Sequence, residues 1–297
     1  MKLADTIQNE YSSLEEKKMN NIQTDTEKIS VICSAYEYWL RLTLAHRYNI
    51  RSHEIELYHL AHNEIKKVGY YTAEEITAFS CRLQEYQDYE KKENHIKIGF
   101  SSTGIFLSKL INHKHQRSKK DNEKYVLLLQ ELKKPIDGLG FKLYGADVQV
   151  HGNLGNFSCN KVKNGKITIH GNVGMHFGKY ISGGSIHIFG DANHSFCQYM
   201  NQGEVTLEGN LIGPMFSDQG YHSAHSLHTG KIHIKKDADY IGNIQSGNIC
   251  IDGNCSRLEK IWGGTVEICG ELTQTSFTKP DHSKGKVLHQ GKRVFVR

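Results

Sequence analysis

Four residues in the second half of the chain have side chains that can bind a metal ion. Three histidines recur at intervals of three residues and a carboxylate precedes them: Asp218, His222, His225 and His228. Three imidazoles and a carboxylate are an adequate ligand set for zinc. The spacing is less favourable, because such positions drift around a helix and alternate between the faces of a strand. In a chain with 18 histidines, the set is a candidate zinc site with an ordinary polar loop as its alternative, and we expect no other cofactor.

A second candidate is the basic stretch His113–Lys120, which reads HKHQRSKK. Such a stretch can contact nucleic acid, an anionic membrane or an acidic protein surface. No aromatic residue is interleaved with these charges, and the whole chain carries a formal charge of only +5. We therefore interpret the stretch as a solvated linker between helices and expect no nucleic-acid binding.

The cysteines and the N-terminus indicate the compartment. Seven cysteines, an odd number with no Cys-x-x-Cys pair, favour reduced thiols over a disulfide framework. The first thirty residues contain no apolar signal region, and apolar stretches elsewhere are too short to span a bilayer. We expect a cytoplasmic protein with no transmembrane segment; the sequence leaves open export by a route without a cleaved signal peptide.

The first domain, predicted over residues 1–135, has the apolar spacing of helices. Apolar residues three and four apart predict a helix over 25–48 and another over 52–68. Gly69 follows the second helix and is the residue type that commonly ends one.

Three further segments complete this domain. Thr72 and Glu75 have the spacing of a capping box and predict the start of a third helix. Residues 95–112 fit a short strand or a loop, followed by a helix from Thr103. Apolar spacing over 121–134 predicts a last helix, which ends before a proline. The sequence thus predicts a bundle of four or five helices.

Beyond residue 135 a seven-residue phrase replaces the helical spacing. In each copy two apolar residues stand two apart, and glycines enclose most copies. The first four copies begin 19 residues apart, at 146, 165, 184 and 203. The remaining copies begin at 230, 247, 264 and 285, after one longer insertion at 210–229.

This repeat predicts a parallel β-helix. Apolar residues two apart share one face of a strand, and repetition lets each copy stack on the next to form a continuous core. Nineteen residues are too few for a strand, a crossover helix and their turns, but they suit three short strands with corners. We expect a second domain over 136–297, a right-handed parallel β-helix of about eight rungs.

Two regular features accompany the repeat. Glycines mark corners where the chain bends and where a Cβ would crowd the next rung. An asparagine or aspartate follows the closing corner, and such residues can form side-chain ladders between rungs: Asn153, Asn172, Asp191, Asn210, Asp237 and Asn254.

The repeat also predicts which side chains form columns on the outer face. His151 and His170 stack in one column, and Thr168, His187 and Thr206 stack in another. Such columns can bind a metal or an acidic partner; we interpret them as a solvated sheet face. Cys159 and Cys197 hold the position that Gly178 has in the rung between them, which indicates small corner or core residues.

Three segments resemble the GXGXG-type β-helix, a domain that closes the large subunit of glutamate synthase and forms much of one of the subunits of formylmethanofuran dehydrogenase. They are Gly171-Asn-Val-Gly174, Tyr180-Ile-Ser-Gly-Gly184 and Cys197-Gln-Tyr-Met200. The resemblance covers roughly residues 140–291. It implies the β-helix fold and a scaffolding role between other domains, and it supplies no catalytic residue.

These observations predict a non-catalytic scaffold or protein-interaction protein, and catalytic residues are not identified. The partner is expected to be a protein. A second copy of the chain is a further possibility, through the β-helix end at Arg293–Arg297, where apolar residues alternate. The alternative function is an enzyme with an unrecognised site, with or without a metal ion, at the histidine-rich insertion or at the domain junction.

Overall fold

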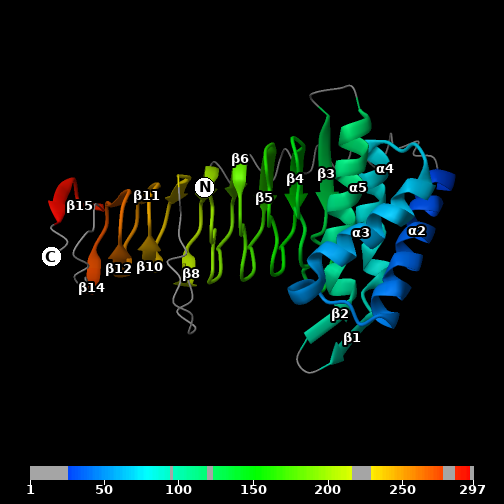
Figure 1. The fold of residues 1–297 in the computed structure, drawn as a ribbon, viewed down its shortest axis with the longest axis horizontal. Helices are drawn as coiled ribbons and strands as arrows, with labels where there is room; N and C mark the ends of the chain where they lie inside the picture. The colour runs from blue at the N-terminus through cyan, green and yellow to red at the C-terminus, as the bar shows by residue number, and fades with distance from the viewer. Residues whose placement is uncertain (1–25, 94–95, 119–122, 216–228, 277–284, 295–297) are drawn as a thin grey trace.

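The computed structural model describes residues 26–93, 96–118, 123–215, 229–276 and 285–294. They form a rod in which four helices lie against one end of a parallel β-solenoid of about seven turns (Figure 1). The predicted architecture, a helical region followed by a parallel β-helix with rungs of about 19 residues, is confirmed.

The helical region contains four α-helices and one hairpin among the described residues. The helices are α2 (Thr26–Ala45), α3 (Ile50–Val68), α4 (Ala73–Arg82) and α5 (Thr103–Arg117). The short 3₁₀ helices η1 (Leu83–Tyr86) and η2 (Phe100–Ser102) flank the antiparallel hairpin of β1 (Glu90–Glu93) and β2 (Ile96–Gly99). None of the described helices combines the length and the apolar composition needed to cross a bilayer.

The sequence signals at the helix ends are confirmed. The Thr72 side chain accepts a hydrogen bond from the backbone N–H of Glu75, and the Glu75 carboxylate accepts one from Thr72. Gly69 ends α3 with a φ of 82°. Within the bundle, the buried Tyr36 ring packs against the rings of Phe79 and Phe106, with centroids 5.3 and 5.2 Å away.

Each of the eight repeated phrases forms one strand of a ten-stranded sheet. Its strands, in order along the rod, are β3 (Lys124–Leu128), β4 (Asp147–His151), β5 (Lys166–His170), β6 (Ser182–Ile188), β7 (Gln202–Leu207), β9 (Lys231–Ile234), β11 (Asn248–Ile251), β13 (Thr265–Ile268), β15 (Lys286–His289) and β16 (Lys292–Val294). All neighbours are parallel except β15 and β16, which are antiparallel. The inward-facing positions are buried, as the period of two predicts.

The wall behind this sheet changes character along the rod. In the later turns it is a four-stranded parallel sheet of β8 (Leu211–Pro214), β10 (Ala238–Ile244), β12 (Cys255–Ile261) and β14 (Leu272–Ser276). In the earlier turns the backbone alternates in sign of φ, as at Phe157, Cys159 and Lys161, with φ of 59°, 57° and 60°. Cys159 and Cys197 are buried there in line with Gly178, which confirms them as small corner residues.

The helix predicted over 121–134 is wrong. Lys124–Leu128 forms β3, which pairs in parallel with β4, so the sheet begins before residue 136. Tyr125, Leu127 and Leu129 are buried, which is the period of a strand. The apolar run fits both periods, and the free edge of β4 supplies hydrogen bonds that decide between them.

Helix α5 caps the first turn of the solenoid. The backbone N–H of Asp137 donates to Ser101 O at 2.6 Å, and that of Gly140 donates to the Ser108 hydroxyl at 2.8 Å. The Asn112 amide donates to Lys142 O, 2.9 Å away. The buried apolar residues of the helices and the solenoid form one continuous cluster. The helical region therefore closes the end of the sheet that would otherwise expose its core.

The predicted side-chain ladder is present. The side-chain Oδ1 of each member accepts a hydrogen bond from the backbone N–H of the equivalent residue one turn further on. Its members are Asn153, Asn172, Asp191, Asn210, Asp237 and Asn254. Beside it the corner glycines stack closely: a Cβ on Gly171 would lie 2.3 Å from Gly152 O, and one on Gly190 would lie 2.5 Å from Gly171 O. A Cβ at these glycines would collide with the neighbouring backbone, although Lys236 holds the equivalent position one turn before Gly253.

Candidate functional site

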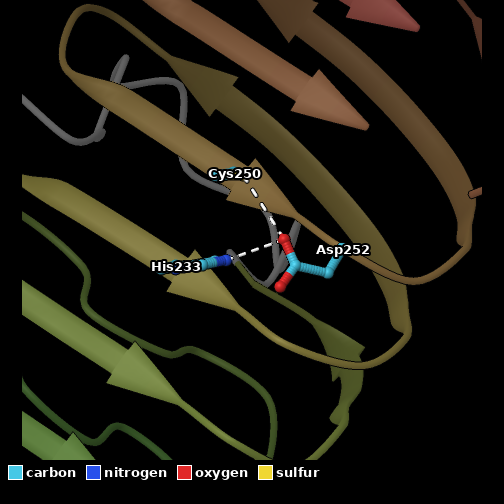
Figure 2. A group of neighbouring side chains, drawn as sticks. All are labelled: His233, Cys250 and Asp252. Carbon is cyan, nitrogen blue, oxygen red and sulfur yellow. Dashed lines mark hydrogen bonds and ion pairs between the residues drawn. The ribbon is translucent and has the colours of Figure 1, made fainter. Parts of the chain in front are cut away.

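The predicted zinc ligands Asp218, His222, His225 and His228 lie outside the described residues. Within the described residues, another group of side chains that could hold a metal ion lies on the outer face of the ten-stranded sheet. It consists of His233 from β9, Cys250 from β11 and Asp252 just beyond β11 (Figure 2). One ligand atom from each residue lies within 4.8 Å of the other two.

Strand register places these three side chains together. His233 pairs with Cys250 across β9 and β11, and Cys250 pairs with Glu267 across β11 and β13. Asp252 follows two residues after Cys250, so its side chain returns to the same outer face. His233 Nε2 lies 2.8 Å from Asp252 Oδ1, and the Cys250 thiol lies 3.7 Å from the same oxygen.

The diagonal contact between His233 and Asp252 recurs elsewhere on this face. It joins the fourth position of one phrase to the sixth position of the next. Gln149 and His170 are in contact in this way at 3.0 Å, and His187 and Glu208 at 2.7 Å. The contact alone is thus a repeated element of the sheet surface. The copy of this contact at His233 differs from the others because the Cys250 thiol lies beside it.

Burial and neighbouring charges shift the pKa values of two members of the group. Burial raises the pKa of Cys250 to about 11, and the negative charges of Asp252, Cys269 and Glu267 add to the effect. Burial also tends to raise the pKa of Asp252, but His233 and Lys235 outweigh it and hold that pKa below its usual value. Lys235 Nζ lies 3.4 Å from Asp252 Oδ2, which leaves Oδ1 facing His233 and Cys250.

The predicted outer columns are confirmed as stacked side chains. The rings of His151 and His170 are stacked with centroids 4.7 Å apart, and Phe189 continues the stack at the same spacing. Thr168, His187 and Thr206 are register partners on β5, β6 and β7. Burial, followed by the charges of Lys124 and His187, lowers the pKa of His170. These columns are packed rings on a sheet face.

An open depression of about 310 Å³ lies at the junction of the helices and the solenoid. Arg51, Lys97, Asp137 and His176 are among its lining residues. Burial raises the pKa of Asp137 to about 6, and burial lowers that of His176 to about 4. Asp137 Oδ1 accepts a hydrogen bond of 2.7 Å from the backbone N–H of Asn156.

We expect Asp137→Asn to stabilise the protein at neutral pH. The folded-state pKa of about 6 lies above the unfolded value of about 3.9. The carboxyl's stabilising contribution is therefore complete below about pH 4 and is lost as pH rises through about 6. The amide keeps the acceptor for Asn156 without the charge, so the variant should gain roughly 1–3 kcal/mol at pH 7.5.

Urea unfolding at pH 5 and pH 7.5 measures this effect. From pH 5 to pH 7.5, the free energy of unfolding should decrease in the wild type relative to that of Asp137→Asn. Asp88→Asn, at an exposed carboxyl, is the matched control. Its free energy of unfolding should change between the two pH values as that of the wild type does. Equal pH dependence in wild type and Asp137→Asn would contradict the assignment.

The sequence suggested that the basic stretch His113–Lys120 is a linker between helices, but part of the stretch is helical. Its first part is the end of α5, where Lys114 is buried and forms an ion pair of 2.9 Å with Glu123. His113 Nδ1 lies 2.8 Å from the Tyr71 hydroxyl, and burial lowers the His113 pKa to about 4. Residues 119–122 lie outside the described part of the chain.

A different set of cations forms a surface of its own, which we call the lysine wall. It lies on α5 and on the first three turns of the solenoid, and its members are Lys109, Lys142, Lys161, Lys163 and Lys179. Lys109 Nζ lies 4.7 Å from the Tyr58 ring centroid, and Lys161 Nζ lies 4.9 Å from that of Phe141. In the described residues one ion pair reaches the wall, from Lys161 to Glu54 at 3.1 Å.

Sequence reasoning missed both the cysteine group and the lysine wall, although signals for each are present. His233 and Cys250 hold the fourth position of successive phrases, and Asp252 holds the sixth. Lys142 and Lys161 are 19 residues apart, which is one turn. Comparisons with protein-family models, with curated proteins and with solved structures find no match to this chain.

Proposed function

We propose that this protein is a non-catalytic scaffold that holds an acidic protein partner against its lysine wall. The observation that carries the proposal is the concentration of five lysines, four of them buried or half-buried, on one surface with one paired carboxylate among the described residues. The continuous core from the helices into the solenoid supports the rigid part of the role.

The lysine wall is electrostatically unfavourable in the free protein. Burial lowers the pKa of Lys109, Lys142 and Lys179, and the charges of neighbouring lysines lower each further, while Glu54 offsets part of the effect at Lys142 and Lys179. Like charges held together cost stability, and such an arrangement is typical of a binding surface. Carboxylates of a partner would relieve the repulsion and satisfy the ammonium groups.

The side chains around the wall favour protein over nucleic acid. Single-stranded nucleic acid needs aromatic faces open for base stacking. Here lysine ammonium groups lie over the rings of Tyr58 and Phe141. The rings of Tyr180 and Tyr199 stack on each other with centroids 4.7 Å apart. These faces are occupied, and the free chemistry of the wall is positive charge.

Fluorescence anisotropy with labelled poly-L-glutamate tests the proposal on the full chain. Wild-type protein should bind the probe, and binding should weaken as salt is added. The triple variant Lys142→Gln, Lys161→Gln, Lys179→Gln should bind about 10- to 100-fold more weakly, since each contact of this kind contributes on the order of 0.5–1 kcal/mol.

The matched control removes three lysines from the outer face of the ten-stranded sheet: Lys124→Gln, Lys166→Gln, Lys286→Gln. It changes the net charge equally and should leave the affinity within about twofold. The proposal fails if wild type does not bind the probe at low salt, or if the control loses as much affinity. Tighter, wall-dependent binding of an oligodeoxythymidine of matched charge would assign the surface to nucleic acid instead.

Association with a second copy of the chain is a subordinate proposal at the far end of the rod. β16 covers β15 of the ten-stranded sheet, while β14 is the last strand of the four-stranded sheet within the described residues. An edge strand of this kind can pair with another chain. Sedimentation of the same samples without probe reports whether the chain pairs with itself.

An enzyme at the junction is the second candidate function. Its support is the depression that contains Asp137 and His176, two titratable groups with shifted pKa values. The stability measurement on Asp137→Asn also tests this candidate. If the pKa of the Asp137 carboxyl proves ordinary, the main observation for the candidate is lost.

The relation to the GXGXG-type β-helix is also proposed. It is supported by the 19-residue step and by the column of stacked glycines at Gly152, Gly171 and Gly190. All seven cysteines lie within the described residues as free thiols, which supports placing the protein in the cytoplasm.

A further inference from the structure

We propose that His233, Cys250 and Asp252 bind a zinc ion on the outer face of the ten-stranded sheet, with one coordination position left open. Figure 2 shows one carboxylate oxygen of Asp252 joined by dashed lines to both His233 and Cys250. Nitrogen, sulfur and oxygen donors within 4.8 Å of one another converge from two neighbouring strands and the residue after β11.

The donor types select the metal. Thiolate and imidazole together favour zinc over magnesium or calcium, which prefer oxygen ligands. Zinc bonds of about 2.0–2.3 Å place tetrahedral ligand atoms about 3.5 Å apart, so the donors must move inward by about 1 Å. His233 and Cys250 are half-buried and Asp252 is exposed, so their side chains can rotate this far while the strands stay paired.

The surroundings provide access and a fourth ligand. His233 and Cys250 line an open depression of about 400 Å³, which admits an ion and a coordinating water. Three protein ligands and a water complete a tetrahedral site.

The same sheet contains a comparison site without the thiol. His187 and Glu208 make the same diagonal contact as His233 and Asp252, and Thr206 stands between them where Cys250 stands in the other copy. A surface histidine–carboxylate pair therefore forms without a cysteine, and the thiol at Cys250 requires a separate reason. Metal ligation is the reason that its neighbours support.

Zinc binding at this site must release protons. The thiol of Cys250 loses its proton to solvent as the Zn–S bond forms, and His233 binds through a neutral nitrogen. Affinity should therefore rise with pH, by about tenfold per pH unit for each proton released.

Cobalt titration of the full chain in a phosphine reductant tests the site, because Co²⁺ bound to thiolate gives a charge-transfer absorption that histidine-only binding lacks. The parent for all samples is the variant Asp218→Ala, His222→Ala, His225→Ala, His228→Ala, so the other predicted zinc ligands do not contribute. We expect about one Co²⁺ per chain with this absorption, displaced by Zn²⁺.

Two substitutions decide the assignment. Cys250→Thr copies the comparison site and should abolish the thiolate absorption and weaken zinc binding at least about tenfold. Thr206→Cys builds the same donor set at His187 and Glu208 and should raise the bound metal to about two ions per chain. Thermal unfolding without metal shows whether each variant folds.

Three results would overturn the proposal. They are a parent protein without stoichiometric thiolate absorption, an absorption that persists in Cys250→Thr, and a folded Thr206→Cys protein that binds no second ion. The first two results exclude Cys250 as a ligand. The third shows that a histidine, a cysteine and a carboxylate in this diagonal arrangement do not suffice to bind the ion.

Discussion

Gly104→Ala is expected to destabilise the protein by roughly 2–4 kcal/mol, although alanine has a higher helix propensity than glycine. Gly104 lies in α5, and alanine in a helix is favoured over glycine by about 1 kcal/mol. A Cβ here would lie 2.2 Å from Leu139 N and 2.4 Å from Asp137 O, both in the backbone of the first solenoid turn. Helix α5 must move away, which stretches the hydrogen bond from Gly140 to Ser108.

Urea unfolding measures this loss, and the two tryptophans report where it acts. Trp39 is buried in the helical region and Trp262 lies in the solenoid. In a Trp262→Phe background, fluorescence follows the helices alone, while circular dichroism follows the whole chain. We expect both signals to move to lower urea, because α5 belongs to both cores.

Gly69→Ala is the control for this substitution. A Cβ there meets no atom within 4 Å, although its φ of +82° disfavours alanine. It should cost about 1 kcal/mol from backbone strain alone. If Gly104→Ala is as stable as wild type, the helix can separate from the first turn freely and does not act as a tight cap.

Phe177→Ala should destabilise the solenoid by roughly 3–5 kcal/mol, which is the usual loss for a buried phenylalanine. Phe177 is fully buried, and its ring stacks on that of Phe196 with centroids 5.6 Å apart. Removing it leaves a cavity between two turns that contact mainly their neighbours. Because a solenoid is stabilised turn by turn, we expect the Trp39 and Trp262 transitions to separate.

Phe189→Ala is the matched control, twelve residues further along the chain and directly after β6 of the ten-stranded sheet. Its half-buried ring faces outward and stacks on His170 and His187, with centroids 4.7 and 4.4 Å away. The loss should be about 1 kcal/mol. Equal losses from the two substitutions would show that the interior of the solenoid is not close-packed at Phe177.

The repeat explains why so much of the solenoid was predictable. Alternating apolar residues and the 19-residue step define both the strand and the spacing of its copies. Thr72 and Glu75 predict their helix start because a capping box is a local interaction. The Asn and Asp ladder follows from the same step, since each member contacts its own equivalent.

Prediction failed where a distant partner decides the outcome. Tyr125, Leu128, Leu129 and Leu132 have helical spacing, while Tyr125, Leu127 and Leu129 alternate as in a strand. The backbone of β4 hydrogen-bonds to this segment and makes it β3. Capping by α5 was equally beyond the sequence, because the close approach of Gly104 to Leu139 joins residues that no periodicity relates.

The cysteine group shows the same division. Position within the phrase already assigns His233, Cys250 and Asp252 to the outer face. Their positions also indicate that His233 and Cys250 are neighbours, while the diagonal contact of His233 with Asp252 is seen only in the structure. The sequence by itself determined the rungs, their corners and the direction in which each side chain points, because these depend on local periodicity. Only the tertiary structure decided that Lys124–Leu128 joins the sheet and that α5 caps its end, because strand pairing and capping arise from contacts between segments distant along the chain.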